Sequence, residues 1–351
     1  MNLNSIQINN FRNVKDVVVN FDDKQHALIC GPNMSGKTNT LNAIYWAFTG
    51  VDLEGSNDNR ANLNKITQDP IRVTLNFDDF TFARICKMED DKPSVTIEID
   101  GKEAKTIKFG EATLHSKLGL SDIILEQPSG FDIVKFLLNP LYFTQVSTKS
   151  LRSFFLWLAN IDLNAISEKQ NKVVKETLNK FKKVDPYQLG DSISKEIKKC
   201  SKIVDQCKGA ILLFPSIKEE ANNLIKEWSK NLAIAKADEA SADKYALCVS
   251  KKLNDFYKSK MKIEVCLLEK GVGEDVFADV CYPILPKSKL PFDLGSYAEK
   301  TLVAAKFINE VSTTFNIRPL PLLVDNLESL DANTFKSFEE LNVAYIGAIV
   351  K

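Results

Sequence analysis

Residues 31–38 read GPNMSGKT, which matches the spacing G-x-x-x-x-G-K-[ST] of a phosphate-binding loop. In such a loop, glycines placed like Gly31 and Gly36 let successive backbone N–H groups turn inward around the β- and γ-phosphates of a nucleotide. The ammonium group of Lys37 adds a positive charge, and the hydroxyl of Thr38 is a ligand for Mg²⁺. The motif predicts binding of ATP and Mg²⁺; the alternative is a glycine-rich turn that matches by chance.

The residues on either side of this loop are expected to place it between a strand and a helix. The apolar run ALIC at 27–30 predicts a buried strand, and TLNAIYWAF at 40–48 predicts a helix. The amino end of a helix attracts anions because its first backbone N–H groups have no partner within the helix. The flanking elements therefore strengthen the nucleotide-binding interpretation.

A second candidate for the same site lies near the end of the chain. Residues 322–325 read LLVD, an apolar strand that ends in the carboxylate of Asp325. In ATPases a carboxylate in this place holds Mg²⁺ through a water molecule. Apolar strands that end in aspartate are common, so the pattern gains its weight from the loop at 31–38. The two motifs together predict both halves of an ATP–Mg²⁺ site.

Composition limits the classes of protein that need to be considered. The 351 residues are enough for one large domain or two ordinary ones, and 46 basic residues balance 46 acidic ones. We therefore expect no global attraction to nucleic acid, and any basic surface must be local. Since no apolar run approaches about 18 residues and the first residues lack a signal pattern, we expect a cytoplasmic protein without membrane contact. The seven cysteines form no C-x-x-C pair, which argues against a disulfide framework or a zinc site.

The first 160 residues and the last 90 read as mixed α/β. Alternating apolar and polar residues predict a strand at 5–11 and an antiparallel neighbour at 17–21. Further strands are expected at 72–77, 80–86, 95–99 and 344–350. The strands near the amino terminus should form an antiparallel meander.

The stretch between these parts is helical in pattern and rich in lysine. Residues 164–260 contain 20 lysines, no arginine and 13 acidic residues, an excess of about seven positive charges. Apolar residues step by three and four, as in Ile193, Ile197 and Cys200, which is typical of two packed helices. Breaks at Pro186 and around 209–215 predict a helical hairpin with arms of about 40 residues and its tip near 209–216.

A third segment carries a resemblance to a known family. Residues 294–305 read LGSYAEKTLVAA, and the run EKTLVA at 299–304 matches the second half of the signature L-S-G-G-E-K-T-L-V-A. This signature is that of ABC-type ATPases of the SMC, RecF and SbcC group, which the chain resembles. The opening segment INNFRN at 8–13 and the form of the loop at 31–38, followed by Asn39, are also similar to this group.

The resemblance implies a fold, a division of the chain and a set of site residues. The fold is α/β: a P-loop NTPase of the ABC-ATPase head type with an N-terminal antiparallel β subsheet and an inserted helical hairpin, a short coiled coil. The expected parts are an N-terminal lobe at 1–160, the hairpin at 161–260 and a C-terminal lobe at 261–351. The expected ATP-binding residues are Gly31, Asn33, Ser35, Gly36, Lys37, Thr38, Asn39 and Arg12, the Mg²⁺ residues are Thr38, Gln127 and Asp325, and the catalytic residues are Ser296, Asn326 and Glu328. Residues 139–143, Arg152 and 324–330 also resemble short SbcC-like ATPases encoded by bacteriophages.

Departures from the family pattern leave the rate of hydrolysis open. Tyr297 and Ala298 replace the two signature glycines, with Ser296 on the signature serine. Asn326 stands where the family has the glutamate that orients the attacking water, and an amide is a poor proton acceptor. Glu328, two residues later, is either a substitute for that glutamate or a solvated loop acid. The γ-phosphate-sensing histidine of the family is missing, and the hairpin has no C-x-x-C apex, which excludes a zinc hook.

Two of the assigned residues have an equally simple structural interpretation. Gln127 is placed like the glutamine that joins Mg²⁺ to the second lobe, but it is also a polar turn residue before a proline, and Gln145 is the next candidate. Arg12 is expected to reach a phosphate, or else to be an ordinary surface arginine after a strand. The lysines of the hairpin either follow a DNA backbone or form a solvated helix face.

These patterns, together with what the resemblance implies, give three candidate functions. The first is a slowly hydrolysing ATPase head that forms a homodimer around two ATP molecules, binds DNA weakly without sequence preference and controls a nuclease or recombinase partner. The second is a hydrolysis-deficient, ATP-gated clamp or sensor that Asn326 keeps closed. The third, a small-molecule P-loop kinase, is disfavoured because it would not need the segment at 299–304.

Overall fold

The computed structural model describes residues 2–23, 25–63, 69–267, 269–270, 277–278, 281–317, 320–341 and 343–350. The chain forms two compact units, one of residues 1–150 with 285–351 and one of residues 151–284. We call them the phosphate-loop unit and the hairpin unit. The second is an insertion into the first, with ends at 151 and 284 against the expected 161 and 260; the three-part division stays a prediction.

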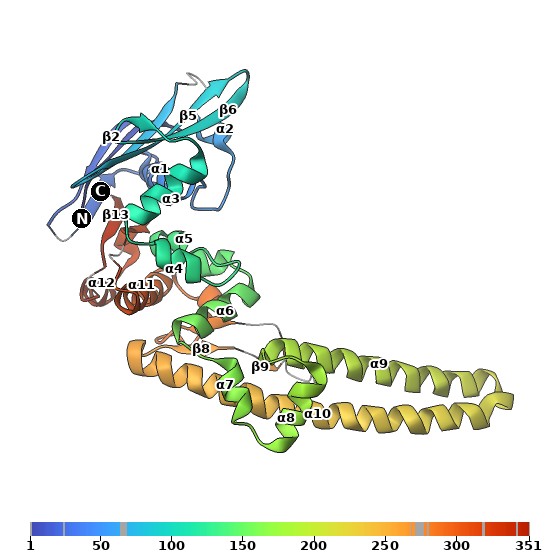
Figure 1. Ribbon diagram of the computed structural model, residues 1–351. Helices are drawn as coiled ribbons and strands as arrows, with labels where there is room; N and C mark the ends of the chain where they lie inside the picture. The colour runs from blue at the N-terminus through green and yellow to red at the C-terminus, as the bar shows by residue number, and fades with distance from the viewer. Residues whose placement is uncertain are drawn as a thin grey trace. The chain divides into compact units, whose positions relative to one another are not determined.

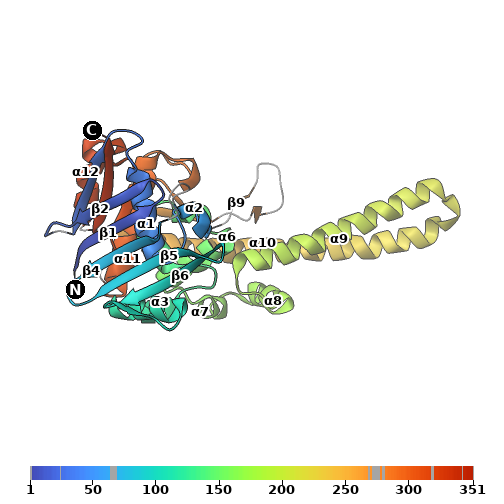
Figure 2. The ribbon, with the colours of Figure 1, turned by 90° about the horizontal axis from the view of Figure 1, so that it is seen from above.

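The first sheet of the phosphate-loop unit is an antiparallel meander with one strand out of sequence order. Its order is β2-β1-β4-β5-β6-β7, with bounds Leu3–Phe11 (β1), Val14–Asn20 (β2), Ile71–Phe77 (β4), Thr81–Glu89 (β5), Lys92–Ile99 (β6) and Lys102–Glu103 (β7) (Figure 2). Burial alternates along β4, as the period of two in a strand requires when one face is covered. The face with Ile6 and Ile8, both fully buried, packs against α1 (Lys37–Thr49).

The second sheet is parallel and carries the site. Its order is β12-β13-β3, with bounds His26–Gly31 (β3), Leu322–Val324 (β12) and Tyr345–Val350 (β13). Residues 40–48 of α1 are all buried because this helix contacts strands of both sheets. Since the strands are parallel, the loop after β3 and the residue after β12 come to the same edge.

The remaining elements of the phosphate-loop unit are helices (Figure 1). They are α2 (Asn59–Asn62), α3 (Ile107–Lys117), α4 (Ser121–Glu126), α5 (Ile133–Leu138), α11 (Tyr297–Thr314) and α12 (Ala332–Glu339), with short 3₁₀ helices at Tyr142–Gln145, Phe292–Leu294 and Leu327–Ser329. Phe143 packs edge-on against Phe292 and Phe307, with ring centroids 5.4 and 5.3 Å apart. These rings join the 3₁₀ helix at Tyr142–Gln145 to the 3₁₀ helix before α11 and to α11 itself.

The hairpin unit is dominated by two antiparallel helices, α9 (Pro186–Leu213) and α10 (Lys218–Met261) (Figures 1 and 2). Its other elements are most of α6 (Thr148–Leu158), then α7 (Leu163–Glu168), α8 (Lys172–Phe181), β8 (Glu264–Cys266), β9 (Glu269–Lys270), β10 (Phe277–Ala278), β11 (Tyr282–Ile284) and a 3₁₀ turn at Pro215–Ile217. The predicted stripe is buried at Ile193 and Cys200, which confirms the hairpin.

Two details of the hairpin differ from the prediction. Helix α9 continues through Gly209 to Leu213, so the turn lies at 214–217. A single glycine inside a helix costs only about 1 kcal/mol relative to alanine, which the packing of two long helices outweighs. Pro186 does not interrupt the first arm but begins it, in the first turn where a missing N–H costs nothing, and Asp185 caps that turn. The arms are therefore unequal, with 28 and 44 residues.

The expected fold class is confirmed, an α/β phosphate-loop head with an antiparallel subsheet and an inserted helical hairpin. All seven cysteines lie in described segments, and none of them is paired in a disulfide. Within the described ranges no cluster of three His, Cys, Asp or Glu side chains is arranged to hold a metal ion. Among those same residues, no helix combines the length and apolar character needed to cross a bilayer.

Candidate nucleotide site

The phosphate loop has the backbone geometry that its glycines allow. Gly36 has φ of 94°, in the left-handed region, and it caps the amino end of α1. A side chain at Gly31 would require Ser35 to move, because a Cβ atom there would lie 2.7 Å from Oγ of Ser35. Asn33 and Ser35 are exposed on the loop surface. The sequence thus folds locally into a turn that aims the N-terminus of α1 outward.

Lys37 lies inside this turn. Its side chain is largely buried, and Nζ donates hydrogen bonds to the carbonyl oxygens of Gly31 (3.0 Å) and Pro32 (2.8 Å). Both acceptors are neutral oxygens on the loop itself. A phosphate bound in the loop offers the same ammonium group charged acceptors, whose hydrogen bonds are about twice as strong.

Thr38 and Asp325 are brought together across 287 residues of sequence. The Thr38 hydroxyl donates to Oδ2 of Asp325 at 2.8 Å, and Oδ1 accepts from the backbone N–H of Asn326 at 3.1 Å. Neighbouring oxygen ligands of Mg²⁺ lie about 3 Å apart, since each is about 2.1 Å from the ion. The hydroxyl and the carboxylate therefore fit one Mg²⁺ coordination sphere, directly or through a water molecule.

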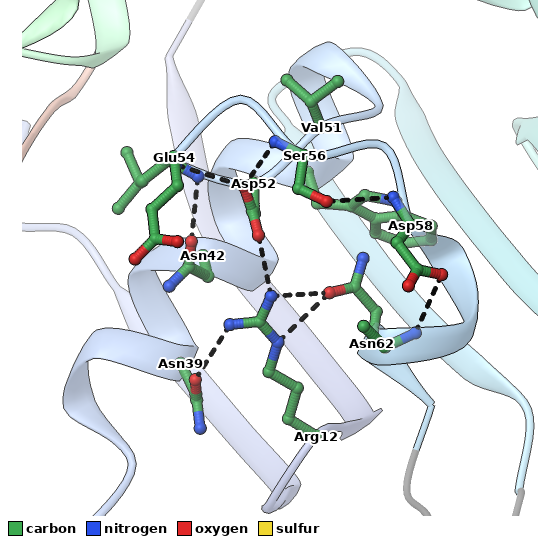
Figure 3. Close-up of polar contacts among 12 residues, drawn as sticks. Arg12, Asn39, Asn42, Val51, Asp52, Glu54, Ser56, Asp58 and Asn62 are labelled. Atoms are coloured by element: carbon green, nitrogen blue, oxygen red, sulfur yellow. Dashed lines mark hydrogen bonds and ion pairs between the residues drawn. The ribbon is translucent and has the colours of Figure 1, made fainter.

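Arg12 is the centre of a polar network beside the loop (Figure 3). Its Nη2 donates to Oδ2 of Asp52 (2.9 Å) and, together with Nε, to Oδ1 of Asn62 (2.9 and 3.2 Å). Nη1 reaches Oδ1 of Asn39 at 3.4 Å, and the amide group of Asn39 donates to Oδ1 of Asn13 at 2.6 Å. The network joins the end of β1 to the first turn of α1.

Asp52 also organises the loop that follows α1. This buried carboxylate accepts from the backbone N–H groups of Glu54 and Ser56 through Oδ1 while Oδ2 holds Arg12 (Figure 3). Leu53 is fixed from both sides: its N–H donates to Asn42, and its carbonyl oxygen accepts from Asn139 and Gln145. Gln145, the second choice for the Mg²⁺ glutamine, thus has a hydrogen-bond partner in this loop.

Ser296 is exposed at the start of α11. Its hydroxyl caps the helix by accepting from the N–H of Glu299 at 3.3 Å. Tyr297, which follows it, lies near the other half of the site. Burial raises the pKa of the Tyr297 hydroxyl, and the negative charges of Asp325 and Glu328 raise that pKa further. The signature segment therefore starts beside the end of β12 in the same unit.

Of the three remaining candidates, Asn326 is hydrogen-bonded to Asp325 through its backbone N–H and not through its side chain. Gln127 accepts through Oε1 from the N–H of Ile133, the first residue of α5, at 2.8 Å. Asn326 is exposed and has φ of 55°, in the left-handed region that asparagine tolerates better than most residues. Glu328 is exposed on the 3₁₀ turn that follows.

Some residues of the site escaped the sequence patterns. Asp52, Asn62 and Asn13 complete the Arg12 network, yet none is among the candidate site residues taken from the sequence. Asn13 directly follows Arg12 in the opening segment, and that adjacency is the one available signal. Asp52 and Asn62 come from separate turns, so only the folded chain brings them together.

Comparisons with known proteins decide the family. A family model described as "AAA domain" matches residues 5–265, about three quarters of the chain. The chain belongs to this AAA-domain family. Its phosphate loop and both arms of its hairpin fall inside the matched region. The C-terminal segment with Ser296 and Asp325 lies outside it.

Curated relatives of this AAA-domain chain include DNA replication and repair proteins RecF. The protein from Bacillus cytotoxicus is 27% identical over 139 residues, which cover 38% of this chain and 34% of the relative. The protein from Bacillus thuringiensis is 27% identical over 140 residues, covering 38% and 33%. The resemblance to RecF-type heads is thereby confirmed, and the match spans about a third of the length of these relatives.

Two solved structures are similar to the AAA-domain chain at low identity. The Smc head domain of Pyrococcus furiosus, solved with an extended coiled coil and bound to the C-terminal domain of ScpA, is 14% identical with a TM-score of 0.48, covering 100% of this chain and 90% of that one. RecF with ATP is 15% identical with a TM-score of 0.44, covering 99% and 93%. Both scores are low, and nothing further follows from them.

Proposed function

We propose that this chain is an ATP-binding head that hydrolyses ATP slowly, dimerises around ATP and acts in DNA repair or recombination. The observation that carries the proposal is the 2.8 Å contact between the Thr38 hydroxyl and the Asp325 carboxylate, beside a loop that encloses Lys37. The family match supports ATP binding. The similarity to RecF supports the role in DNA repair.

The residues of the site have distinct tasks in this proposal. Thr38 and Asp325 would hold Mg²⁺, which would supply charge neutralisation during phosphoryl transfer. Lys37 exchanges its two carbonyl acceptors for phosphate oxygens. The N–H groups at the start of α1 bind the same anion. Arg12, tied to Asp52, positions Asn39 and the loop at 51–58 around the nucleotide.

Lys37→Ala tests the foundation of the proposal. We expect titration calorimetry to show no binding of Mg²⁺–ATP, because the variant loses the charge at the centre of the loop. Lys336→Ala, which removes an exposed lysine of α12 in the same unit, is the matched control and should bind like the parent protein. Equal ATP affinity in the Lys37 and Lys336 variants would exclude an ATP-binding loop.

Dimerisation rests on Ser296, which is exposed in its own copy and bonded only within its helix cap among the described contacts. We propose that it contacts the γ-phosphate held by Lys37 of a second copy. Light scattering with a slowly hydrolysed ATP analogue should show a dimer that Ser296→Ala loses and Ser296→Thr retains, since threonine keeps both the hydroxyl and the cap. A monomer with and without the analogue would mean that the Tyr297–Ala298 segment has lost this function.

The second candidate function, a hydrolysis-deficient clamp, is favoured by Asn326. Its amide cannot take a proton from water, and Glu328 is the nearby carboxylate in the same turn. If Glu328 is the base, Glu328→Gln should lower steady-state ATP hydrolysis by about 10²–10⁴-fold. Asn326→Asp adds a carboxylate that tolerates a positive φ, unlike glutamate, and should raise turnover. A neutral Glu328→Gln combined with a faster Asn326→Asp would identify the clamp.

The biological role in this proposal is based on the similarity to RecF. In the proposal, closure of two heads controls the access of DNA to a nuclease or recombinase partner. The exposed lysines of the hairpin unit supply weak DNA binding without sequence preference. Affinity purification of the full chain with and without ATP tests for the partner, and a partner that binds Lys37→Ala equally well would disconnect it from the ATP cycle.

A further inference from the structure

A cavity of about 650 Å³ lies at the end of the parallel sheet where β3 and β13 begin. His26 and Tyr345, which pair across these two strands, both line it, and we call it the amino-end cavity. The phosphate loop follows the other end of β3, roughly 16 Å along the strand. Cavities of about 300–1,000 Å³ hold small molecules. The described residues that line this one include none of the nucleotide site, so it is a separate candidate site.

Tyr345 brings a buried hydroxyl to the amino-end cavity. The residue is only 4% exposed, and its ring packs against those of His26 and Phe338, with centroids 4.2 and 5.3 Å away. The hydroxyl makes no hydrogen bond with any residue that the structure describes. Burial raises its pKa, and the charges of Glu339 and Asp22 raise that pKa further, so the hydroxyl lies in the field of both carboxylates. A buried polar group without a partner, placed at a cavity, indicates a bound molecule that supplies the missing hydrogen bond.

The charges at the amino-end cavity favour a cation. The charged residues of segments 20–28 and 336–345, which supply its lining, are Asp22, Asp23, Lys24, Lys336, Glu339 and Glu340. Four acids thus stand against two lysines, of which Lys24 lies outside the described residues and Lys336 is exposed one turn before Glu339. Asp23 and Glu339 form no ion pair with a described residue. Since Glu339 is also the last residue of α12, the partial negative charge of that helix end adds to its own.

Apolar and aromatic surface completes the lining of the amino-end cavity. Leu28 is 55% exposed on β3, and the rings of His26 and Tyr345 stack at the start of the two strands. The alkyl chain of a cationic molecule packs along such a surface while its charged end stays with polar groups. An ammonium group is also attracted to the face of a tyrosine ring. The lining therefore suits a molecule that combines an alkyl chain with positive charge.

The origin of the acids indicates how many charges this molecule carries. Glu339 ends α12, whereas Asp23 belongs to the turn between β2 and β3, so two separate elements offer a carboxylate to the cavity. We propose that the amino-end cavity binds a small linear diamine, with one ammonium group at Glu339 and the Tyr345 hydroxyl and the other at Asp23. Binding requires neither nucleotide nor Mg²⁺, and it is independent of the proposed ATP-driven pairing of heads.

Titration calorimetry of the full chain with 1,4-diaminobutane, without nucleotide, measures this binding directly. Tyr345→Phe keeps the ring and removes only the hydroxyl, and it should weaken the affinity at least about tenfold, the effect of losing a hydrogen bond to a charged group. Glu339→Gln should weaken it as much. Glu340→Gln is the matched control, because Glu340 is exposed next in the chain and is not among the described residues that line the cavity. Lys37→Ala should bind the diamine like the parent, which separates this cavity from the ATP site.

Changes to the ligand test the need for two charges. Butylamine has one ammonium group on the same carbon chain and should bind at least about tenfold more weakly, because it loses one charge-assisted contact. 1,4-Butanediol has no charge and should give no binding heat. Equal affinity for diaminobutane and butylamine, no heat with the parent protein, or a Glu340→Gln variant as weak as Glu339→Gln would each overturn the proposal. A lysine-containing peptide that binds here while the diamine does not would assign the cavity to a protein partner and would overturn it as well.

Discussion

The two units use ion pairs of nearly the same length in opposite ways. In the phosphate-loop unit, Nη2 of Arg84 lies 2.6 Å from Oε1 of Glu111, and the Arg84 side chain is 3% exposed. In the hairpin unit, Nζ of Lys195 lies 2.7 Å from Oδ2 of Asp191, and the Lys195 side chain is 73% exposed. The distance alone does not set how much an ion pair stabilises the fold. Water screens the exposed Lys195–Asp191 pair far more than the buried Arg84–Glu111 pair.

The choice of cation follows the same division. Residues 151–284 contain a single arginine, Arg152, whereas the phosphate-loop unit places Arg12 and Arg84 in fixed networks. Arginine presents a planar fork of donors, which suits a defined set of acceptors, and lysine is a mobile point charge. In the phosphate-loop unit, Arg12 and Arg84 hold other groups in a fixed geometry. In the hairpin unit, most cations are lysines, which add positive charge to the surface.

Removing Arg84 should give the largest change. Its Nε donates to the carbonyl oxygen of Ala47 in the last turn of α1, and Glu111 takes Nη2. Arg84→Leu leaves that carbonyl and a partly buried carboxylate without their donor, which should lower the free energy of unfolding by about 3 kcal/mol. Urea unfolding measures this loss of stability. Glu111→Gln is the control and should cost less, because an amide oxygen still accepts from Arg84. Equal stability of Arg84→Leu and the parent would remove the contrast between the units.

Asp52→Asn should have an intermediate effect. The amide keeps one acceptor for the N–H groups of Glu54 and Ser56 but loses the charge that pairs with Arg12. We expect a loss of about 1–2 kcal/mol, the range for a hydrogen bond to a charged group. Hydrogen exchange should show faster exchange confined to residues 51–58, while Asp331→Asn, in the exposed cap of α12, should leave that loop unchanged. Uniform loss of protection across α1 would show that Asp52 supports the whole unit rather than the loop.

The same contrast explains how much could be predicted from the sequence. The loop at 31–38 encodes its geometry in neighbouring residues, so its strand, turn and helix follow from their order, and Asp325 follows from the apolar run that it ends. The Arg12 network takes residues from β1, α1 and two later turns, and no pattern in sequence relates Asp52 to Arg12. The break expected at Gly209 is absent. Packing along the hairpin stabilises the helix there, and local helix propensity does not include that packing.

Replacing lysines of the hairpin unit should change the affinity for DNA and leave the stability of the fold unchanged. Replacing the exposed Lys182, Lys183, Lys198 and Lys199 with glutamate removes phosphate contacts, each of which contributes about −0.9 to the slope of log affinity against log salt. Fluorescence anisotropy with duplex DNA should show weaker binding and a flatter slope, with ATP binding unchanged. Binding that survives the four changes with its salt slope intact would place the DNA site on the phosphate-loop unit.

Lys195→Ala should give the smallest effect. The hydrogen bond to Asp191 raises the pKa of Lys195, and this shift records a favourable contact with the carboxylate. The contact joins two exposed side chains one helical turn apart, and holding them in a single geometry costs side-chain entropy that offsets the screened attraction. We therefore expect a urea midpoint indistinguishable from that of the parent at low and high salt. Asp191→Ala should show the same urea midpoint, since removing either side chain leaves no buried group without its hydrogen-bond partner. A loss of unfolding free energy comparable to that of Arg84→Leu would show that lysines of the hairpin unit also hold groups in a fixed geometry. The contrast between the two units would then be wrong.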